Sequence, residues 1–316
     1  MKLTSCLIAA SILAGVTGLH AGDTSKVVIE EPPAINPFDA AIRPITSPTL
    51  FDLAVPRTQA HAIFMHQNHP GHLSTTLGRL PVGGDFQLYA LQLEIALSEK
   101  FSLVAAKDGY IDFNPDATLS ETEGFANLSA GFKYAFLYDP AEALAAAFNL
   151  QIEVPTGNRE VWQGEGDGAA VPSVSFLKLY DRLQIAGNLG FRIPFDNGAE
   201  STVGHLNAHV SYAVTERFRP LLEVNWFRVL DEGNGGNRFS DQVGGAVPSV
   251  ATFEGGDLIN FGANNVSNKD LVTLGVGFRY RLTDNIDLGA AYEIPLTEEE
   301  DNLMESRITI DAVIHF

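Results

Sequence analysis

The last eleven residues, Ser306-Arg-Ile-Thr-Ile-Asp-Ala-Val-Ile-His-Phe316, decide the fold class. Successive side chains of a β-strand point to opposite faces, so a strand here has two different sides. One side is apolar and ends on Phe316, whereas the other carries Arg307, Thr309, Asp311 and His315 together with Val313. A closed transmembrane barrel needs such strands, because its outer face meets lipid and its inner face meets water or polar groups.

This ending resembles the C-terminal strand of Gram-negative outer-membrane β-barrels, in which a terminal Phe belongs to the assembly signal. The resemblance implies that Phe316 is part of that signal. It also implies the barrel assembly machinery as a partner and the Gram-negative outer membrane as the location.

Composition agrees with a barrel and excludes a nucleic-acid partner. The 316 residues include 20 Lys and Arg against 39 Asp and Glu, a formal charge of -19, and nucleic acids require basic surfaces instead. Overall 45% of residues are hydrophobic, which suits strands that are apolar on one side only. The expected partners are membrane lipid, lipopolysaccharide bridged by divalent cations, and small solutes.

The N-terminus has the features of a secretory signal peptide over residues 1–21. Lys2 provides the positive charge, and Leu3 to Leu19 is an apolar run. Cleavage is expected after Ala21, with Gly18 as a second candidate because Leu19 is large for the position three residues before a cut. The only cysteine, Cys6, lies within this segment, so the mature chain has no thiol for disulfides, catalysis or metal binding. No other stretch is long and apolar enough for a transmembrane helix, which leaves a barrel as the spanning structure.

Residues 22–58 form a separate, proline-rich segment. Prolines at positions such as Pro33, Pro37, Pro44 and Pro56 prevent long regular elements. We expect an irregular N-terminal arm. Two placements are open: the arm hangs in the periplasm, or it folds into the barrel as a plug.

Residues 59–316 are expected to form an all-β, antiparallel, up-and-down transmembrane barrel of about twelve strands. Short polar turns alternate with long Gly- and Asn-rich loops, which is typical of this architecture. The predicted strands are 59–67, 85–97, 101–111, 124–137, 142–154, 170–180, 183–194, 204–214, 218–230, 269–282, 286–297 and 305–316. An alternative with fourteen strands uses Val247 to Phe253 as another strand.

The connection 231–268 is long for a compact fold. Loops of this length are usually functional or disordered. It is either a mobile surface loop or a loop that folds into the lumen and narrows it.

The middle of the chain resembles a known family. The motifs are Gly124-Phe-Ala-Asn-Leu-Ser-Ala-Gly-Phe-Lys-Tyr134, the strand end Glu153-Val-Pro-Thr-Gly157, the loop Gly164-Glu-Gly-Asp-Gly168 and the segment Asn188-Leu-Gly-Phe-Arg192. Their order is similar to that of the outer-membrane transporter family named for the meta-cleavage (MetA) pathway of phenol degradation. Asn127 stands where that family often has Asp. The resemblance implies an outer-membrane channel or uptake protein with a loosely defined substrate.

Period-two alternation assigns charged side chains of both signs to the inner wall. Rings of charge select ions and steer solutes in pores, although the same groups can also pair and fill a narrow lumen. The predicted pore-lining residues are Lys133, Glu153, Arg192, Arg219, Glu223, Arg279, Arg281, Asp287 and Glu293. The sequence therefore predicts a porin-like protein for passive uptake of small solutes, with hydrophobic or aromatic compounds as one option. The alternative is a non-conducting barrel with a structural or adhesive role.

Two smaller groups of residues deserve a test. His66, His69 and His72 are weak candidates for Zn²⁺ or Cu²⁺ ligands, and a polar loop is the simpler interpretation. His209 and Ser211 resemble the His-x-Ser pair of outer-membrane phospholipase, but a Ser–His nucleophile needs a third, orienting group. We predict no enzyme activity, no catalytic residue, no metal and no cofactor.

Overall fold

The computed structural model describes residues 36–236 and 242–316. The signal peptide expected at residues 1–21 and the first part of the expected arm lie outside the described residues. Within the described part, no helix is long and apolar enough to cross a membrane.

Strands make up most of the described chain, and the helices are single turns. The strands are β1 (Gln59–Asn68), β2 (His72–Thr75), β3 (Gly78–Pro81), β4 (Asp85–Ser98), β5 (Phe101–Lys107), β6 (Tyr110–Asn114), β7 (Thr122–Phe125), β8 (Leu128–Asp139), β9 (Leu144–Val154), β10 (Ala169–Tyr180), β11 (Leu183–Pro194), β12 (Thr202–Tyr212), β13 (Phe218–Asp231), β14 (Asp270–Thr283), β15 (Ile286–Pro295) and β16 (Ser306–His315). The helices are η1 (Pro37–Ala40), η2 (Arg159–Val161), η3 (Gln242–Gly245), α1 (Val247–Val250) and η4 (Glu299–Asp301).

The strands close into an antiparallel barrel. β1 pairs with both β4 and β16, so the first and last long strands of the sheet meet and the barrel closes, with a free edge left only at the short β7. β5 and β6 pair with successive parts of β4, and β8 and β7 continue the wall beside them. β5 and β6 together occupy one position in the wall, and β7 and β8 together occupy the next. A short break separates the two strands at each position.

The wall therefore has twelve strand positions, which confirms the predicted architecture. The fourteen-strand alternative is wrong, because α1 occupies residues 247–250 where the extra strand was expected. Pro248 fits the first turn of a helix, where its missing N–H is not needed. The short β2–β3 hairpin forms a separate two-stranded sheet.

The two faces of the wall differ as the period-two pattern predicts. In β16, Ile308 and Ile310 are 43% and 50% exposed, whereas Thr309 and Asp311 are buried. Outward apolar side chains face the lipid that surrounds such a barrel, and inward polar side chains meet one another or the segments inside.

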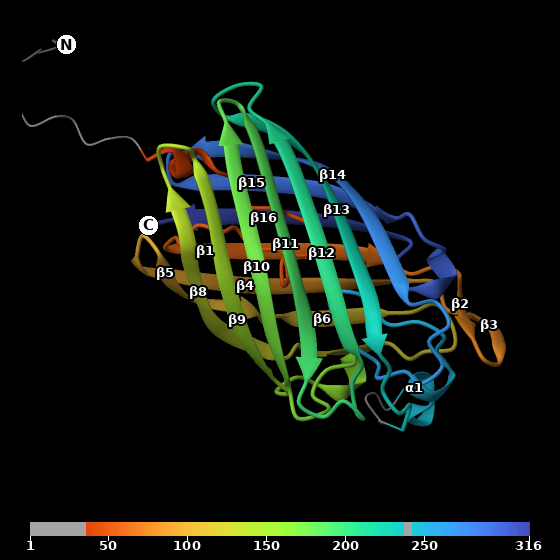
Figure 1. Cartoon of the computed structure of the whole chain (residues 1–316). Helices are drawn as coiled ribbons and strands as arrows, with labels where there is room; N and C mark the ends of the chain where they lie inside the picture. Colours follow the sequence, from red (N-terminus) through yellow and green to blue (C-terminus); the bar gives the residue numbers. More distant parts are fainter. Residues whose placement is uncertain (1–35, 237–241) are drawn as a thin grey trace, which may run out of the picture. The chain divides into compact units, whose positions relative to one another are not determined.

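The two ends of the barrel are unlike. Tight turns such as Asp181–Arg182 join strands at one end, called here the short-turn end, and the C-terminus lies there. Long connections and the β2–β3 hairpin lie at the other, called the long-loop end, together with α1 (Figure 1). In outer-membrane barrels short turns are periplasmic and long loops are extracellular.

Charge on the outer wall should destabilise the barrel in proportion to its depth in the bilayer. Val174 lies in the middle of β10 and is 45% exposed, whereas Tyr180 ends the same strand and is 54% exposed. We predict that Val174→Arg lowers the free energy of unfolding in lipid vesicles by about 2–4 kcal/mol. Tyr180→Arg, the control, should lower it by about 0–1 kcal/mol. Equal effects in guanidinium titrations would contradict the assigned outer face.

Candidate functional site

The nine predicted pore-lining residues all lie on the inner wall. Six are buried, with relative exposures of 3% or less, and three are partly buried. The buried six are Lys133, Glu153, Glu223, Arg279, Asp287 and Glu293, and the partly buried three are Arg192, Arg219 and Arg281. An open, water-filled pore would leave these groups exposed, so their burial means that other groups occupy the lumen.

The occupant is the arm, defined here as residues 36–58. Its backbone bonds to inward side chains from well-separated strands, which places it inside the barrel. Gln184 of β11 accepts from Ile42 N at 2.8 Å and donates to Ile42 O at 2.7 Å. Arg279 of β14 donates to the carbonyls of Arg43 and Pro44, at 2.6 Å and 3.2 Å.

Glu223 of β13 makes the densest contact with the arm. One carboxylate oxygen accepts from Thr46 N at 2.7 Å and from Thr46 Oγ1 at 2.6 Å. Ile45 N donates to both carboxylate oxygens, at 3.1 Å and 3.2 Å. Hydrogen bonds to a charged group contribute about 1.5–3 kcal/mol each, so Glu223 is a principal anchor.

A second anchor is a chain of ion pairs. Arg43 contacts Asp52 within the arm at 3.1 Å, and Lys133 of β8 lies 2.7 Å from Asp52 and 2.9 Å from Glu94 of β4. Burial alone would raise the pKa of Asp52, but Lys133 and Arg43 outweigh it and lower that pKa to about 2. The two cations thus favour the charged form of Asp52, which pairs with Lys133.

Apolar packing completes the plug near the short-turn end. Phe38, Phe51 and Leu53 of the arm form one buried cluster with small inward residues of the wall. The wall members are Ala135, Ala145, Ala147, Leu177 and Ala186. Small side chains leave room for the arm, and burying its aromatic residues there stabilises the inserted position.

The arm enters and leaves at the short-turn end. Asn36 donates to the hydroxyl of Tyr138, close to the turn after β8, at 2.8 Å. Thr58 O accepts from the backbone N–H of Phe316 at 3.1 Å. Between these points the arm turns back after Thr49, whose hydroxyl lies 3.4 Å from Asp257 O.

A second segment, residues 242–268, folds against the long-loop end and is called the cap loop. Phe253 and Phe261 of this loop belong to a buried apolar cluster with Trp162 and Phe113. Glu254 supports the loop by accepting from the backbone N–H groups of Phe261 and Ala263 at 2.6 Å and 2.9 Å.

The cap loop is tied to the wall by Asp257. Its carboxylate makes two bonds with Arg307 of β16, at 2.9 Å and 3.0 Å. Both groups are buried, so the pair is shielded from solvent screening. Of the two interpretations of residues 231–268, the second of the two described parts, 242–268, fits a folded, inserted loop.

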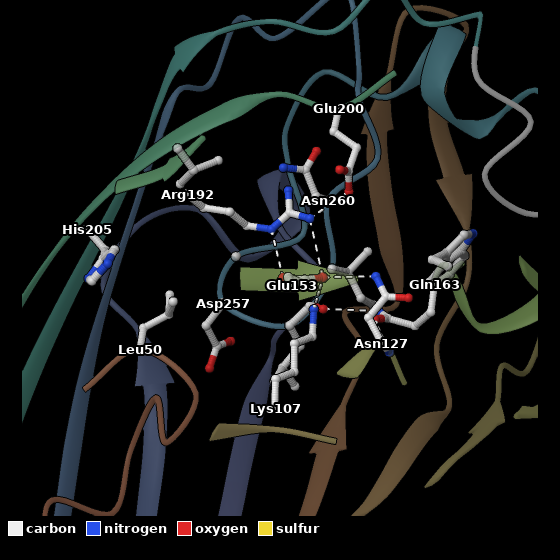
Figure 2. Close-up of a pocket in the computed structure, with 15 residues that line it drawn as sticks. Leu50, Lys107, Asn127, Glu153, Gln163, Arg192, Glu200, His205, Asp257 and Asn260 are labelled. Atoms are coloured by element: carbon white, nitrogen blue, oxygen red, sulfur yellow. Dashed lines mark hydrogen bonds and ion pairs between the residues drawn. The ribbon is translucent and has the colours of Figure 1, made fainter. Parts of the chain in front are cut away.

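Between the arm and the cap loop lies a small cavity of about 20 Å³ with charged and apolar lining residues, called the chamber. Figure 2 shows Arg192 and Lys107 converging on Glu153. Lys107 Nζ lies 2.7 Å from Glu153 Oε1, and Arg192 Nε lies 3.1 Å from Glu153 Oε2. Asn127, at the break between β7 and β8, donates to the same carboxylate at 2.9 Å.

The far side of Arg192 meets Glu200, in the loop after β11. Arg192 Nη2 and Glu200 Oε1 are 2.7 Å apart. Burial raises the pKa of Glu200, and the neighbouring Arg192 opposes that increase. Leu50 of the arm and Asn260 of the cap loop complete the lining, so the chamber is bounded by both inserted segments (Figure 2).

The three candidate histidine ligands are not brought together. His69 is buried with Nδ1 2.9 Å from Leu303 O, His66 lies 3.8 Å from Asp85, and His72 is exposed. Residues 36–236 and 242–316 contain no group of three or more His, Cys, Asp or Glu residues that could hold a metal ion.

His209 and Ser211 do form a triad-like chain. His209 Nε2 lies 2.9 Å from Ser211 Oγ, and His209 Nδ1 lies 2.7 Å from Glu223. Glu223 supplies the orienting group that the sequence did not identify. All three side chains are at most 2% exposed, and Glu223 is also bonded to the arm. Within this chain, Glu223 is the member that contacts the arm.

Several functional residues were missed by sequence reasoning. Gln184, Asp52, Glu200 and Asp257 all lie outside the predicted set, although Gln184 carries a usable signal. It occupies an inward position by alternation along β11. The other three come from irregular segments, where no periodicity indicates direction.

Comparisons with known proteins identify a family and similar folds. A family model described as "Putative MetA-pathway of phenol degradation" matches residues 72–307. An outer membrane channel from Pseudomonas putida F1 superposes with a TM-score of 0.58 at 12% identity, covering 87% of this chain and 100% of that chain. The NanC porin gives a TM-score of 0.49 at 9% identity and covers 82% of this chain and 100% of that chain. No curated protein matches the sequence.

Loss of the Glu223 anchor should loosen the arm. We predict that Glu223→Ala raises the rate of maleimide labelling at Ser47→Cys by at least about tenfold, because each bond to a charged group contributes about 1.5–3 kcal/mol. Ser47 is a suitable reporter, since it is fully buried and its hydroxyl has no hydrogen-bond partner in the described structure.

Glu216→Ala, in an exposed short turn, is the matched control and should leave the labelling rate unchanged. Mass spectrometry of the folded barrel gives both rates. Equal labelling in the Glu223 and Glu216 variants would show that Glu223 does not anchor the arm.

Proposed function

This chain belongs to the family described as "Putative MetA-pathway of phenol degradation", and on that premise we propose that it is a gated outer-membrane channel for small solutes. The observation that carries the proposal is the arm inside a charged lumen. In this account the structure is the closed state, and displacement of the arm opens the path.

The way the arm is held supports reversible displacement. It enters and leaves at one end, and side-chain hydrogen bonds, ion pairs and apolar contacts hold it in place. Withdrawal of the arm leaves the hydrogen bonds between strands intact, so the barrel itself need not unfold. Charged side chains would then line the exposed wall and interact with passing solutes.

A second segment closes the long-loop end of the barrel. The cap loop closes the long-loop end, and the Asp257–Arg307 pair fixes it to the wall. Thr49 of the arm approaches the same residue, Asp257. We therefore assign the two closures to one path, with the arm as the inner gate and the cap loop as the outer gate.

The barrel supports a location in the outer membrane of a Gram-negative bacterium. We propose lipid and lipopolysaccharide as its surroundings there. We further propose that residues 1–21 are removed as a signal peptide and that Phe316, which is 82% exposed, is read by the assembly machinery. Diffusion through this lumen requires no catalytic step.

Removal of the arm should open the channel. We predict that deletion of residues 36–58 increases single-channel conductance in planar bilayers several-fold over the full chain, because the plug is the largest obstacle in the lumen. A heat-dependent gel shift confirms that the shortened barrel has folded. If the folded, arm-free barrel gives no conductance steps, the protein is a non-conducting barrel and the channel proposal fails.

Weakening the outer gate should change the frequency of opening. We predict that Asp257→Asn increases the frequency of conductance steps without changing their size, since it removes a buried ion pair but no part of the wall. Asp270→Asn is the matched control, because Asp270 pairs with Arg228 at exposed positions. An unchanged frequency of conductance steps in Asp257→Asn would show that the cap loop takes no part in gating.

A further inference from the structure

Inward side chains of the wall hold the middle of the arm by its backbone. They are Gln92 of β4, Gln184 of β11, Arg219 and Glu223 of β13, and Arg279 of β14, called here the arm seat. Their bonds go to N–H and C=O groups within residues 40–48. Since every peptide has these groups, the bonds do not depend on the sequence of the arm.

The donors and acceptors of the arm seat follow the order of a peptide backbone. Arg279, which can only donate, bonds to the carbonyls of two consecutive arm residues at 2.6 Å and 3.2 Å. The Glu223 carboxylate accepts from the N–H groups of the next two residues, Ile45 and Thr46. Gln184 both accepts from and donates to a residue earlier in the arm. The seat thus matches a run of carbonyls and N–H groups along one extended chain.

The wall also leaves room for a peptide at this level. A Cβ added at Gly275 of β14 would lie 2.6 Å from Thr46 Cγ2, and one added at Gly289 of β15 would lie 2.9 Å from Ile45 Cδ1. Both distances are too short for a real contact, so a larger residue at either glycine would force the arm away from the wall. The two glycines therefore fit the wall to the thickness of a peptide.

The side chains of the arm add only a few requirements. Ile42 and Ile45 form a buried apolar cluster with Leu221 and Ala291, so apolar side chains fit these two positions. The Thr46 hydroxyl bonds to Glu223 at 2.6 Å. Other sequences with the same kinds of side chain would fulfil these requirements equally well.

Withdrawal of the arm removes the partners of the arm seat. A second peptide would restore the same bonds, whereas a solute without consecutive carbonyl and N–H groups would leave some of these groups unpaired. We propose that the arm seat, once the arm has withdrawn, binds short linear peptides by their backbone, and that such peptides are the solutes of the channel. Both parts rest on the displacement of the arm in the proposed function, but only transport requires conduction.

The arm itself reports whether a peptide takes its place. In the full-length Ser47→Cys chain, maleimide reaches the thiol when the arm is displaced, because position 47 is fully buried. The probe is acetyl-Val-Lys-Pro-Val-Ser-amide, which has the same kinds of side chain as residues 42–46 in a different sequence. One control is the same peptide with methyl groups on the backbone nitrogens of its last two residues. The other control is maltotriose, a neutral solute of comparable size.

We expect the unmodified peptide to raise the labelling rate about tenfold when its concentration is ten times its Kd for the arm-free barrel, because a ligand of one state shifts the equilibrium towards that state. The methylated peptide and maltotriose should change the rate by less than about twofold, because the first cannot donate to Glu223 and the second lacks the backbone groups. A photoreactive form of the unmodified peptide should crosslink to inward residues of β13 and β14.

The controls separate backbone recognition from other kinds of binding. Equal acceleration by the methylated peptide would show that the backbone is not recognised, and equal acceleration by maltotriose would show that hydroxylated solutes bind as well. Either result overturns the proposal, as would no acceleration by the peptide or crosslinks confined to the long-loop end. Peptide-dependent labelling of a barrel that never conducts, even without its arm, would uphold peptide binding and reject the channel. Conductance of the arm-free barrel without any effect of the peptide on labelling would reject peptide binding and leave the channel in place.

Discussion

The structure depends on one constraint: an irregular peptide inside a barrel must have its backbone polar groups satisfied by the wall. A buried N–H or C=O without a partner costs several kcal/mol, and bonds within the arm, such as those from Ala41 N to Phe38 O and from Phe51 N to Ser47 O, satisfy only some of its backbone groups. Glu223, Gln184 and Arg279 meet this need with side chains that point inward from three different strands. The composition of the inner wall is therefore explained by the arm as much as by any solute.

The barrel could be predicted from the sequence because its physics is periodic. Lipid outside and polar groups inside impose alternation along each strand, and the twelve predicted strand positions are confirmed. Alternation is blurred in β10 at Leu177 and Leu179, and the structure gives the reason. Leu177 points inward onto the apolar part of the arm, and Leu179 packs against the same cluster. The fourteen-strand alternative failed because a seven-residue segment of mixed apolar and small polar residues does not distinguish a strand from a short helix with proline in its first turn.

The candidate site was accessible to sequence reasoning only in part. The alternation of side chains along the strands predicted that Glu153 and Arg192 point inward. It could not predict that Glu200 joins them from a loop. Likewise Arg307 could be assigned to the lumen, whereas its partner Asp257 lies fifty residues away in an irregular segment. Contacts between distant segments leave no local pattern in one sequence. The same limit applies to His209 and Ser211, whose third partner, Glu223, lies on the next strand.

The central claim is that the arm must leave its place for the channel to conduct. A Cβ added at Gly275 of β14 would lie 3.6 Å from the Cβ of Thr46, so Thr46→Cys and Gly275→Cys place two thiols within reach of a disulfide in a chain whose only other cysteine is Cys6. Planar-bilayer recording of this double variant tests the claim most directly. The account predicts no conductance steps while the disulfide is closed and their return after reduction. Steps of the same size and frequency in the oxidised and reduced protein would contradict it.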